Sequence, residues 1–214
     1  DLCDAMRATM HEQSPFVRDV TIPASAWGNR LLDVYEPATN VNPRGGGIGQ
    51  GLAMALGAAV ARPDAPTFLM VGDGGLAVHL GELVTIAQER PWMVIVLFND
   101  LGYGVLRNLQ DAHFGRRSGV DLATPDFAVL AESVGIDYRV LKSPADCASI
   151  LAEAVGVGGP VNLYHTESMG AHIPAGTELH LIASDPNLLS FAPAHGTILA
   201  DCRLALEQLA ELCP

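Results

Sequence analysis

The chain has 214 residues, 49% of them apolar and 17% charged, enough to bury a sizeable core in one large domain or in one domain and a fragment. Its net charge of −12 argues against nucleic acid as the main partner, because a phosphate backbone needs a basic face. No run of 18 apolar residues and no charged-then-apolar leader occurs, so neither a membrane span nor a signal peptide is predicted. The cysteines lack a CxxC spacing and are expected to be reduced, in a cytoplasmic protein (Cys3, Cys147, Cys202, Cys213).

Strands and helices alternate along most of the sequence. Apolar periodicity and turn residues predict helices over 2–12, 52–61, 80–90, 127–134 and 144–154, and strands over 16–22, 67–71, 92–98 and 138–141. The stretch from Pro23 to Arg44 is read as irregular, and the strands over 67–71 and 92–98 are nearly all apolar, as in a buried parallel sheet. The pattern predicts an α/β fold with a parallel sheet flanked by helices.

The texture changes after Gly158-Gly159-Pro160. Strands are predicted over 178–184 and 197–199, followed by a helix over 203–212. We therefore expect one domain over 1–161 and a small α/β fragment over 162–214.

Acidic residues follow the two buried strands. Asp73 ends the first, and the pair Asn99-Asp100 ends the second. Ligands of open α/β sheets bind beyond the carboxyl ends of the strands, where hard oxygen donors suit Mg²⁺ or Ca²⁺. Such an ion would bridge to phosphate oxygens, with backbone N–H groups of Gly74, Gly75 and Leu76 at a helix start. The alternative is a plain tight turn at Asp73 and a helix cap at Asn99-Asp100.

The spacing of these residues matches a known family motif. Gly72-Asp73-Gly74 is followed by 24 residues and then Asn99. The surrounding VGDGGLAVHLGELVTIAQERPWMVIVLFNDLGYGVLR resembles the diphosphate-binding domain of the thiamine-diphosphate enzymes that include acetolactate synthase, pyruvate decarboxylase and benzoylformate decarboxylase. GGGIGQGLAMALGAAVA resembles the same family's pyrimidine-side loop and helix, and together the resemblance covers about residues 15–160.

The resemblance implies a role for each matching residue. Asp73 and Asp100 would be side-chain ligands of the metal and Gly102 a backbone ligand, with Asn99 either structural or ligating. Asp100 stands where the family has a second Asn, which keeps an oxygen ligand and adds a negative charge. The full cofactor-binding set also contains Gly72, Gly74, Gly75, Leu76 and Tyr103.

The glycine-rich loop is expected to hold the other end of the cofactor. Ile48 would bend the cofactor by wedging between its two rings, and the backbone of Gly47 would face the aminopyrimidine amine; the alternative for Ile48 is a plain core residue. Thr21 and Ser25 lie where the family often has a hydroxyl on the diphosphate, although ordinary turn hydroxyls explain them equally well.

Four basic residues are read as solvated. His79 lies on a predicted helix, and His113, Arg116 and Arg117 lie in a stretch that is interpreted as a mobile loop. The alternatives are loop closure over the substrate and steering of an anionic substrate by the two arginines.

Part of the family's active site has no counterpart here. The activating glutamate belongs to a separate pyrimidine-binding domain, for which the chain shows no equivalent, so we expect half an active site that is completed in a homodimer or homotetramer. The segment over 162–214 resembles the end of the family's middle domain, most like benzoylformate decarboxylase. In the family that domain precedes the diphosphate-binding domain, whereas here the similar segment follows it. Either the chain is permuted or engineered, or segments are joined out of natural order near residues 160–165. We expect the out-of-order join.

The sequence thus predicts an enzyme that uses thiamine diphosphate and Mg²⁺ (or Ca²⁺) for nonoxidative decarboxylation of a small 2-oxo acid. A carboligase of the acetolactate synthase type is one alternative, and a noncatalytic cofactor-binding half that needs a partner with the pyrimidine domain is another. A nucleotide-binding α/β protein is disfavoured, because GGGIGQG follows an irregular stretch instead of a strand.

Overall fold

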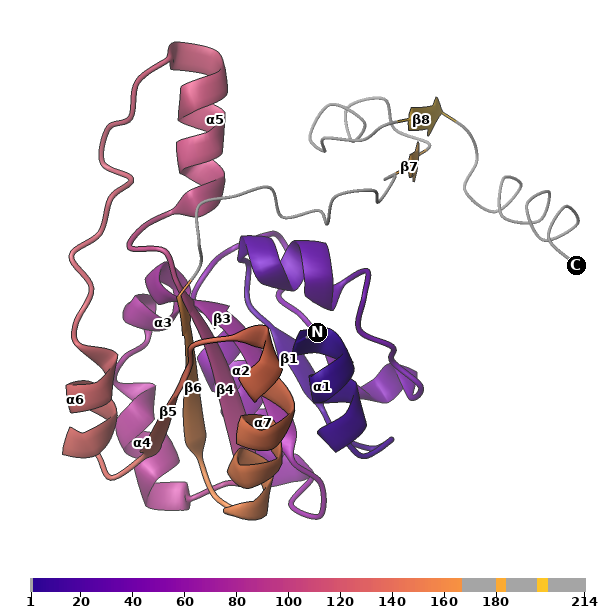
Figure 1. Ribbon diagram of the computed structural model, residues 1–214, viewed down its shortest axis with the longest axis vertical. Coiled ribbons are helices and arrows are strands. Elements are labelled where there is room, and N and C mark those ends of the chain that lie inside the picture. The colour runs from indigo at the N-terminus through magenta and orange to yellow at the C-terminus, as the bar shows by residue number, and fades with distance from the viewer. Residues whose placement is uncertain (1, 167–179, 184–195, 200–214) are drawn as a thin grey trace, which may run out of the picture. The chain divides into compact units, whose positions relative to one another are not determined.

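The computed structural model describes residues 2–166, 180–183 and 196–199 and confirms the α/β class with a parallel sheet (Figure 1). The chain divides into two compact units, Asp1–Met169 and Gly170–Pro214. In the first unit, six strands form one parallel sheet in the order β2-β1-β3-β4-β6-β5. They are β1 (Phe16–Arg18), β2 (Asn40–Val41), β3 (Thr67–Gly72), β4 (Met93–Asn99), β5 (Asp137–Leu141) and β6 (Val161–Thr166).

Helices cover both faces of this sheet. They are α1 (Leu2–Thr9), α2 (Gly51–Ala61), α3 (Asp73–Val78), α4 (Glu82–Glu89), α5 (Gly104–Phe114), α6 (Phe127–Ser133) and α7 (Cys147–Gly156), with short helices η1 (Ala24–Gly28), η2 (Pro37–Thr39) and η3 (Pro144–Asp146). Alternate residues of β3 and β4 point to opposite faces, as the pleat of a strand requires. Phe68 and Met70 pack with α1 and α7, whereas Leu69 and Val71 pack with α2, α4 and α6.

The central strands explain why the sheet forms where it does. Every residue of β3 and of β4 is buried, so both faces of these strands need apolar side chains. Their register pairs Thr67 with Met93 and Gly72 with Phe98. The two strands therefore end at nearly the same level, and the residues that follow them emerge at one edge of the sheet.

The strand order also marks where a ligand should bind. β2 and β3 pair with opposite sides of β1, so the direction in which the sheet is built reverses at β1. Open α/β sheets bind ligands beyond the carboxyl ends of the strands at such a reversal. The loops that follow β1, β3 and β4 are therefore the expected location of the functional site.

Several predicted boundaries need correction. β1 ends at Arg18 instead of continuing to Ile22, because the backbone bends at Val20 and Thr21, directly after the N–H of Asp19 has donated to the carbonyl of Met70. The stretch that was read as a mobile loop around His113 begins inside helix α5. The irregular stretch before Arg44 contains η1, η2 and β2.

The predicted domain boundary also lies too early. β6 pairs with both β4 and β5, so residues 162–166 belong to the first sheet, and the first unit continues to Met169 instead of ending at 161. In the second unit the strands β7 (His180–Ala183) and β8 (Gly196–Leu199) pair in parallel, in the two segments where strands were predicted. The helix predicted over 203–212 lies outside the described residues.

In the part of the chain that the structure describes, no helix is both long enough and apolar enough to cross a membrane.

Candidate functional site

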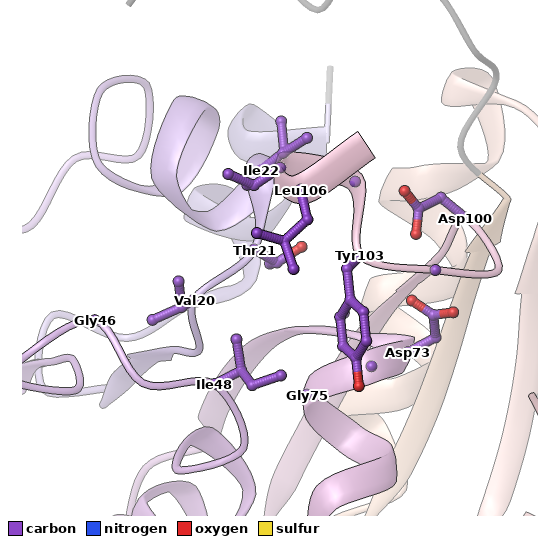
Figure 2. A pocket seen from close by; sticks show the side chains of 15 residues that line it. Val20, Thr21, Ile22, Gly46, Ile48, Asp73, Gly75, Asp100, Tyr103 and Leu106 are labelled. Carbon is purple, nitrogen blue, oxygen red and sulfur yellow. The ribbon is translucent and has the colours of Figure 1, made fainter. Parts of the chain in front are cut away.

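A cavity of about 390 Å³ opens at the carboxyl edge of the sheet (Figure 2). Its walls come from the segments that follow β1, β3 and β4 and from the glycine-rich loop before α2. Figure 2 shows two carboxylates together at one end of the cavity and apolar side chains at the other. The lining residues are Val20, Thr21, Ile22, Gly46, Ile48, Gly72, Asp73, Gly74, Gly75, Asp100, Gly102, Tyr103, Gly104, Val105 and Leu106.

Asp73 is the most deeply buried acid of the cavity. It begins α3 directly after β3, is 1% exposed, and its Oδ2 atom has no hydrogen-bond partner. The pKa of Asp73 is raised to about 6, above all by burial. The charge of Asp100 and a hydrogen bond with its side chain also act to raise this pKa, whereas hydrogen bonds from the backbone of Gly74 and Gly102 lower it. An unpaired carboxylate oxygen at this depth is costly unless a cation or a proton occupies the site.

Asp100 and Gly102 reach the cavity on the loop that follows β4. The Oδ1 atom of Asn99 accepts a hydrogen bond from the N–H of Leu101 at 3.1 Å, and Leu101 has a left-handed backbone with φ 59°. Residues 120–122 hold the other side of the loop: the N–H of Tyr103 donates to the carbonyl of Val120, and the N–H of Leu122 to that of Leu101. The loop is therefore fixed by backbone bonds on both sides.

Arg107 holds this loop from inside. Its guanidinium is largely buried and donates to the carbonyl oxygen of Asp100 at 2.7 Å and to that of Leu101. It pairs with Asp121 at 2.7 Å, and its Nη1 lies 3.6 Å from the Oδ2 of Asp100. A Cβ atom on Gly102 would lie 2.3 Å from Arg107 Nη2 and 2.4 Å from the carbonyl oxygen of Val120, so the loop closes only with glycine at this position.

The carboxylates fit a divalent cation. Two acids in contact, one with a raised pKa and an unpaired oxygen, offer the hard oxygen donors that Mg²⁺ and Ca²⁺ prefer. Within the described residues no cluster of three or more His, Cys, Asp or Glu side chains could hold a metal ion. The remaining ligands would therefore be backbone oxygens and oxygens of a bound molecule, as Mg²⁺ sites with phosphates commonly have.

The glycine-rich loop forms the apolar wall. Ile48 lines the cavity and is 37% exposed, so the plain core reading of this residue is wrong. Gly45, Gly46 and Gly49 all have positive φ, which gives the loop a shape that other residues adopt with strain. The Tyr103 ring packs on Gly74, where an added Cβ would lie 2.7 Å from it.

Not every residue predicted for the site lines the cavity. Thr21 does, whereas Ser25 is exposed on η1. Leu76 is part of the hydrophobic core. Gly47 and Asn99 flank lining residues without lining the cavity themselves. Their roles toward a cofactor stay predictions.

The basic residues also separate. His79 is exposed, as expected of a solvated residue, but its Nδ1 contacts the carbonyl of Gly49. His113 is exposed on α5, Arg116 is exposed, and Arg117 pairs with Asp111.

Sequence reasoning missed two residues that shape the site, Asp19 and Arg107. Asp19 directly follows β1, and its carboxylate accepts backbone N–H groups from the glycine-rich loop. Because the predicted strand extends over 16–22, Asp19 falls inside it, and only the observed end of β1 at Arg18 places this acid at the same edge as Asp73. Arg107 lies at the end of the matched motif, but nothing in the sequence indicates that its guanidinium turns back onto the loop.

Comparison with known proteins agrees with this geometry. Residues 23–164 match the family described as "Thiamine pyrophosphate enzyme, C-terminal TPP binding domain". The chain is 34% identical over 137 residues to the probable acetolactate synthase large subunit of Methanococcus aeolicus. The aligned region covers 63% of this chain and 23% of that protein. It is 30% identical over 136 residues to the acetolactate synthase of Bacillus subtilis (strain 168), covering 63% of the chain and 24% of that protein.

A solved structure shares the fold. The thiamine diphosphate-dependent 4-hydroxybenzoylformate decarboxylase of Rhodococcus jostii RHA1 superposes with a TM-score of 0.71 at 25% identity, over 79% of this chain and 33% of that one. The match thus spans about a quarter of the curated relatives' length and a third of this structure's. The chain belongs to the thiamine pyrophosphate (thiamine diphosphate) enzyme family, and residues 23–164 match that family's C-terminal cofactor-binding domain.

Proposed function

We propose that the chain binds the diphosphate of thiamine diphosphate through Mg²⁺ and serves in the nonoxidative decarboxylation of a small 2-oxo acid. The observation that carries this proposal is the unpaired Oδ2 of Asp73, buried beside Asp100 at the carboxyl edge of the sheet. Ca²⁺ would satisfy the same oxygen donors.

Each group of lining residues would then contact a different part of the cofactor. Asp73 and Asp100 would hold the metal, and the carbonyl of Gly102 would complete its protein ligands. Gly74 and Gly75 line the cavity in the first turn of α3, where backbone N–H groups favour an anion. When bound, the cofactor supplies an electron sink for the loss of CO₂. Ile48 and the other apolar lining residues would orient it and exclude water.

Decarboxylation is supported by the likeness to the solved structure of a 4-hydroxybenzoylformate decarboxylase. A carboligase of the acetolactate synthase type is the second candidate, and the curated relatives with that name support it at higher identity. Both reactions begin with loss of CO₂ from a 2-oxo acid. They differ in whether a proton or a second 2-oxo acid is taken up afterwards.

The active site would be completed from outside the described residues. We propose that a pyrimidine-binding domain supplies the activating glutamate, in a homodimer or homotetramer or from a separate partner. Without that domain this chain would bind the cofactor but turn over slowly.

Calorimetric titration of thiamine diphosphate, with and without Mg²⁺, tests the proposal. We expect binding to the chain that requires Mg²⁺ and is lost in Asp73→Ala. Asp64→Ala is the matched control, because this exposed acid precedes β3 at the opposite edge of the sheet. Equal binding by Asp73→Ala and the unchanged chain would contradict the proposal.

The two reactions are separated by their products. A pyrimidine-domain partner is added to the Mg²⁺-loaded chain, and the mixture receives benzoylformate or pyruvate. Release of an aldehyde with CO₂ supports decarboxylation, whereas acetolactate from pyruvate supports the carboligase. Association with the partner on gel filtration and a gain of activity only in the mixture would identify a split enzyme.

A further inference from the structure

Asp19 is a buried acid outside the cavity. It directly follows β1 and is 3% exposed, and its N–H donates to the carbonyl of Met70 at 2.8 Å. Its carboxylate accepts the N–H of Val20 at 2.6 Å, that of Gly49 at 2.9 Å and that of Gly51 at 3.2 Å. Three backbone donors converge on one carboxylate, which offsets the cost of burying it.

The space around Asp19 admits only glycine at two positions. A Cβ atom on Gly51 would lie 2.7 Å from the Cβ of Asp19, and one on Gly75 would lie 2.9 Å from its Oδ2. Gly51 begins α2 and Gly75 lies in the first turn of α3. The carboxylate therefore occupies the junction of β1, α2 and α3, the three elements that surround the cavity on this side.

The hydrogen bonds of Asp19 hold the loop on the C-terminal side of Ile48. They bind Gly49 and Gly51, one and three residues after Ile48, whereas Gly45 and Gly46 before it have left-handed backbone with open space where a Cβ atom would lie. The carbonyl of Gly49 contacts His79, so both polar groups of that residue are held. The glycines give the loop little stiffness of its own, and its position depends on these bonds.

We propose that Asp19 is the positioning residue that holds Ile48 against the cofactor's rings, an inference that rests on the proposed function. Asp19 does not line the cavity and would touch neither metal nor cofactor. It acts through the glycine-rich loop, whereas the diphosphate end is set independently by Asp73 and Asp100.

Amide hydrogen exchange on the metal-free, cofactor-free chain tests the first half of this inference. Asn at position 19 keeps the shape but replaces one acceptor oxygen with a donor. We expect Asp19→Asn to accelerate exchange of the Gly49 and Gly51 amides by about tenfold or more, because each bond to the charged group is lost or weakened. Leu151→Ala, a core change in α7 on the other face of the sheet, is the control for general destabilisation.

Ligand titration tests the second half. Inorganic pyrophosphate with Mg²⁺ probes the diphosphate end alone, and thiamine diphosphate with Mg²⁺ probes both ends. We expect Asp19→Asn to weaken the binding of thiamine diphosphate by about tenfold, the size of effect that one lost positioning contact gives. The affinity for pyrophosphate should not change. The double variant with Ile48→Ala should bind no more weakly than Ile48→Ala alone, because both changes remove the same wall.

Each contrary result has a distinct meaning. Equal weakening of both ligands, or additive effects with Ile48→Ala, would overturn the positioning role. If the unchanged chain binds neither ligand, the proposed function fails, and so does the inference about Ile48, while the exchange result still reports on the loop. If Asp19→Asn does not fold, the unchanged chain decides: Gly49 and Gly51 must exchange more slowly than Gly45 and Gly46, and uniform fast exchange would overturn the inference.

Discussion

At the scale of single residues, the burial of Asp73 suits the binding of a cation but lowers the stability of the folded chain when no cation is bound. Its carboxyl is buried, faces another acid, and has one oxygen without a partner. The folded chain therefore binds a proton at Asp73 more tightly than the unfolded chain does. The charged form of this carboxyl, with no cation beside it, therefore costs stability at neutral pH.

This cost predicts how stability depends on pH. The pKa of Asp73 rises from 3.8 to about 6 on folding, so its contribution is fully present below pH 3.8 and is lost as the pH rises to about 6. We expect Asp73→Asn, which carries no charge, to stabilise the metal-free chain by about 3 kcal/mol at pH 7 and to change little below pH 4. Urea unfolding between pH 4 and pH 8 in a chelator measures both values.

Mg²⁺ should reverse this order. The ion binds the charged form of Asp73, so saturating Mg²⁺ should raise the free energy of unfolding of the unchanged chain and leave Asp73→Asn nearly unaffected. Asp64→Asn, at an exposed acid, is the control and should show neither effect. A stability of Asp73→Asn equal to that of the unchanged chain at pH 7 would show that burial of this carboxyl has no cost.

At the scale of elements, two other parts of the chain hold the loop after β4 in place. Arg107 of α5 binds two of its carbonyl groups, and residues 120–122 bind it from the other side. Gly102 lies at the point where these contacts leave no room for a side chain. The loop and the first turns of α5 therefore act as one unit that presents Asp100 to the cavity.

Two glycine substitutions separate crowding from helix propensity. Gly102→Ala places a methyl against Arg107 and the backbone of Val120, and we expect a loss of about 1–3 kcal/mol of stability and weaker Mg²⁺-dependent binding. Gly57→Ala, inside α2 with open space around it, should stabilise the chain by about 0.5–1 kcal/mol. Thermal unfolding and titration of both variants give the comparison, and a neutral Gly102→Ala would show that the loop can move aside.

For the whole molecule, the residues that line the cavity all belong to the first unit. All lining residues lie between Val20 and Leu106, and the unit ends at Met169. We therefore expect the first unit to bind the cofactor.

Truncation tests this independence. A chain that ends at Met169 should bind thiamine diphosphate with Mg²⁺ within about twofold of the full chain, because a compact unit with its own core folds by itself. Calorimetry on both chains is the measurement. Loss of binding in the shorter chain, with its circular dichroism unchanged, would assign part of the site to the segment after Met169.

The central strands and the two carboxylates that line the cavity could be predicted from the sequence because their signals are local. The runs over 67–72 and 93–99 are apolar throughout, and such a run tolerates only a strand covered on both faces. Asp73 and Asp100 follow those strands directly, and parallel strands end at a common edge. Patterns of this kind need no knowledge of distant contacts.

The tertiary structure alone decided the rest. β6 alternates apolar and polar residues, a pattern that suits a strand, but its place between β4 and β5 in the first sheet is visible only in the strand pairing. Asp19 reaches Gly49 and Gly51 across about thirty positions of sequence, and Arg107 folds back onto the loop before its own helix. A hydrogen bond between residues that are distant in sequence depends on where the packed elements place those residues. The sequence by itself therefore determined the central strands and the acids that follow them, whereas tertiary packing determined which side chains fix the loops around the cavity.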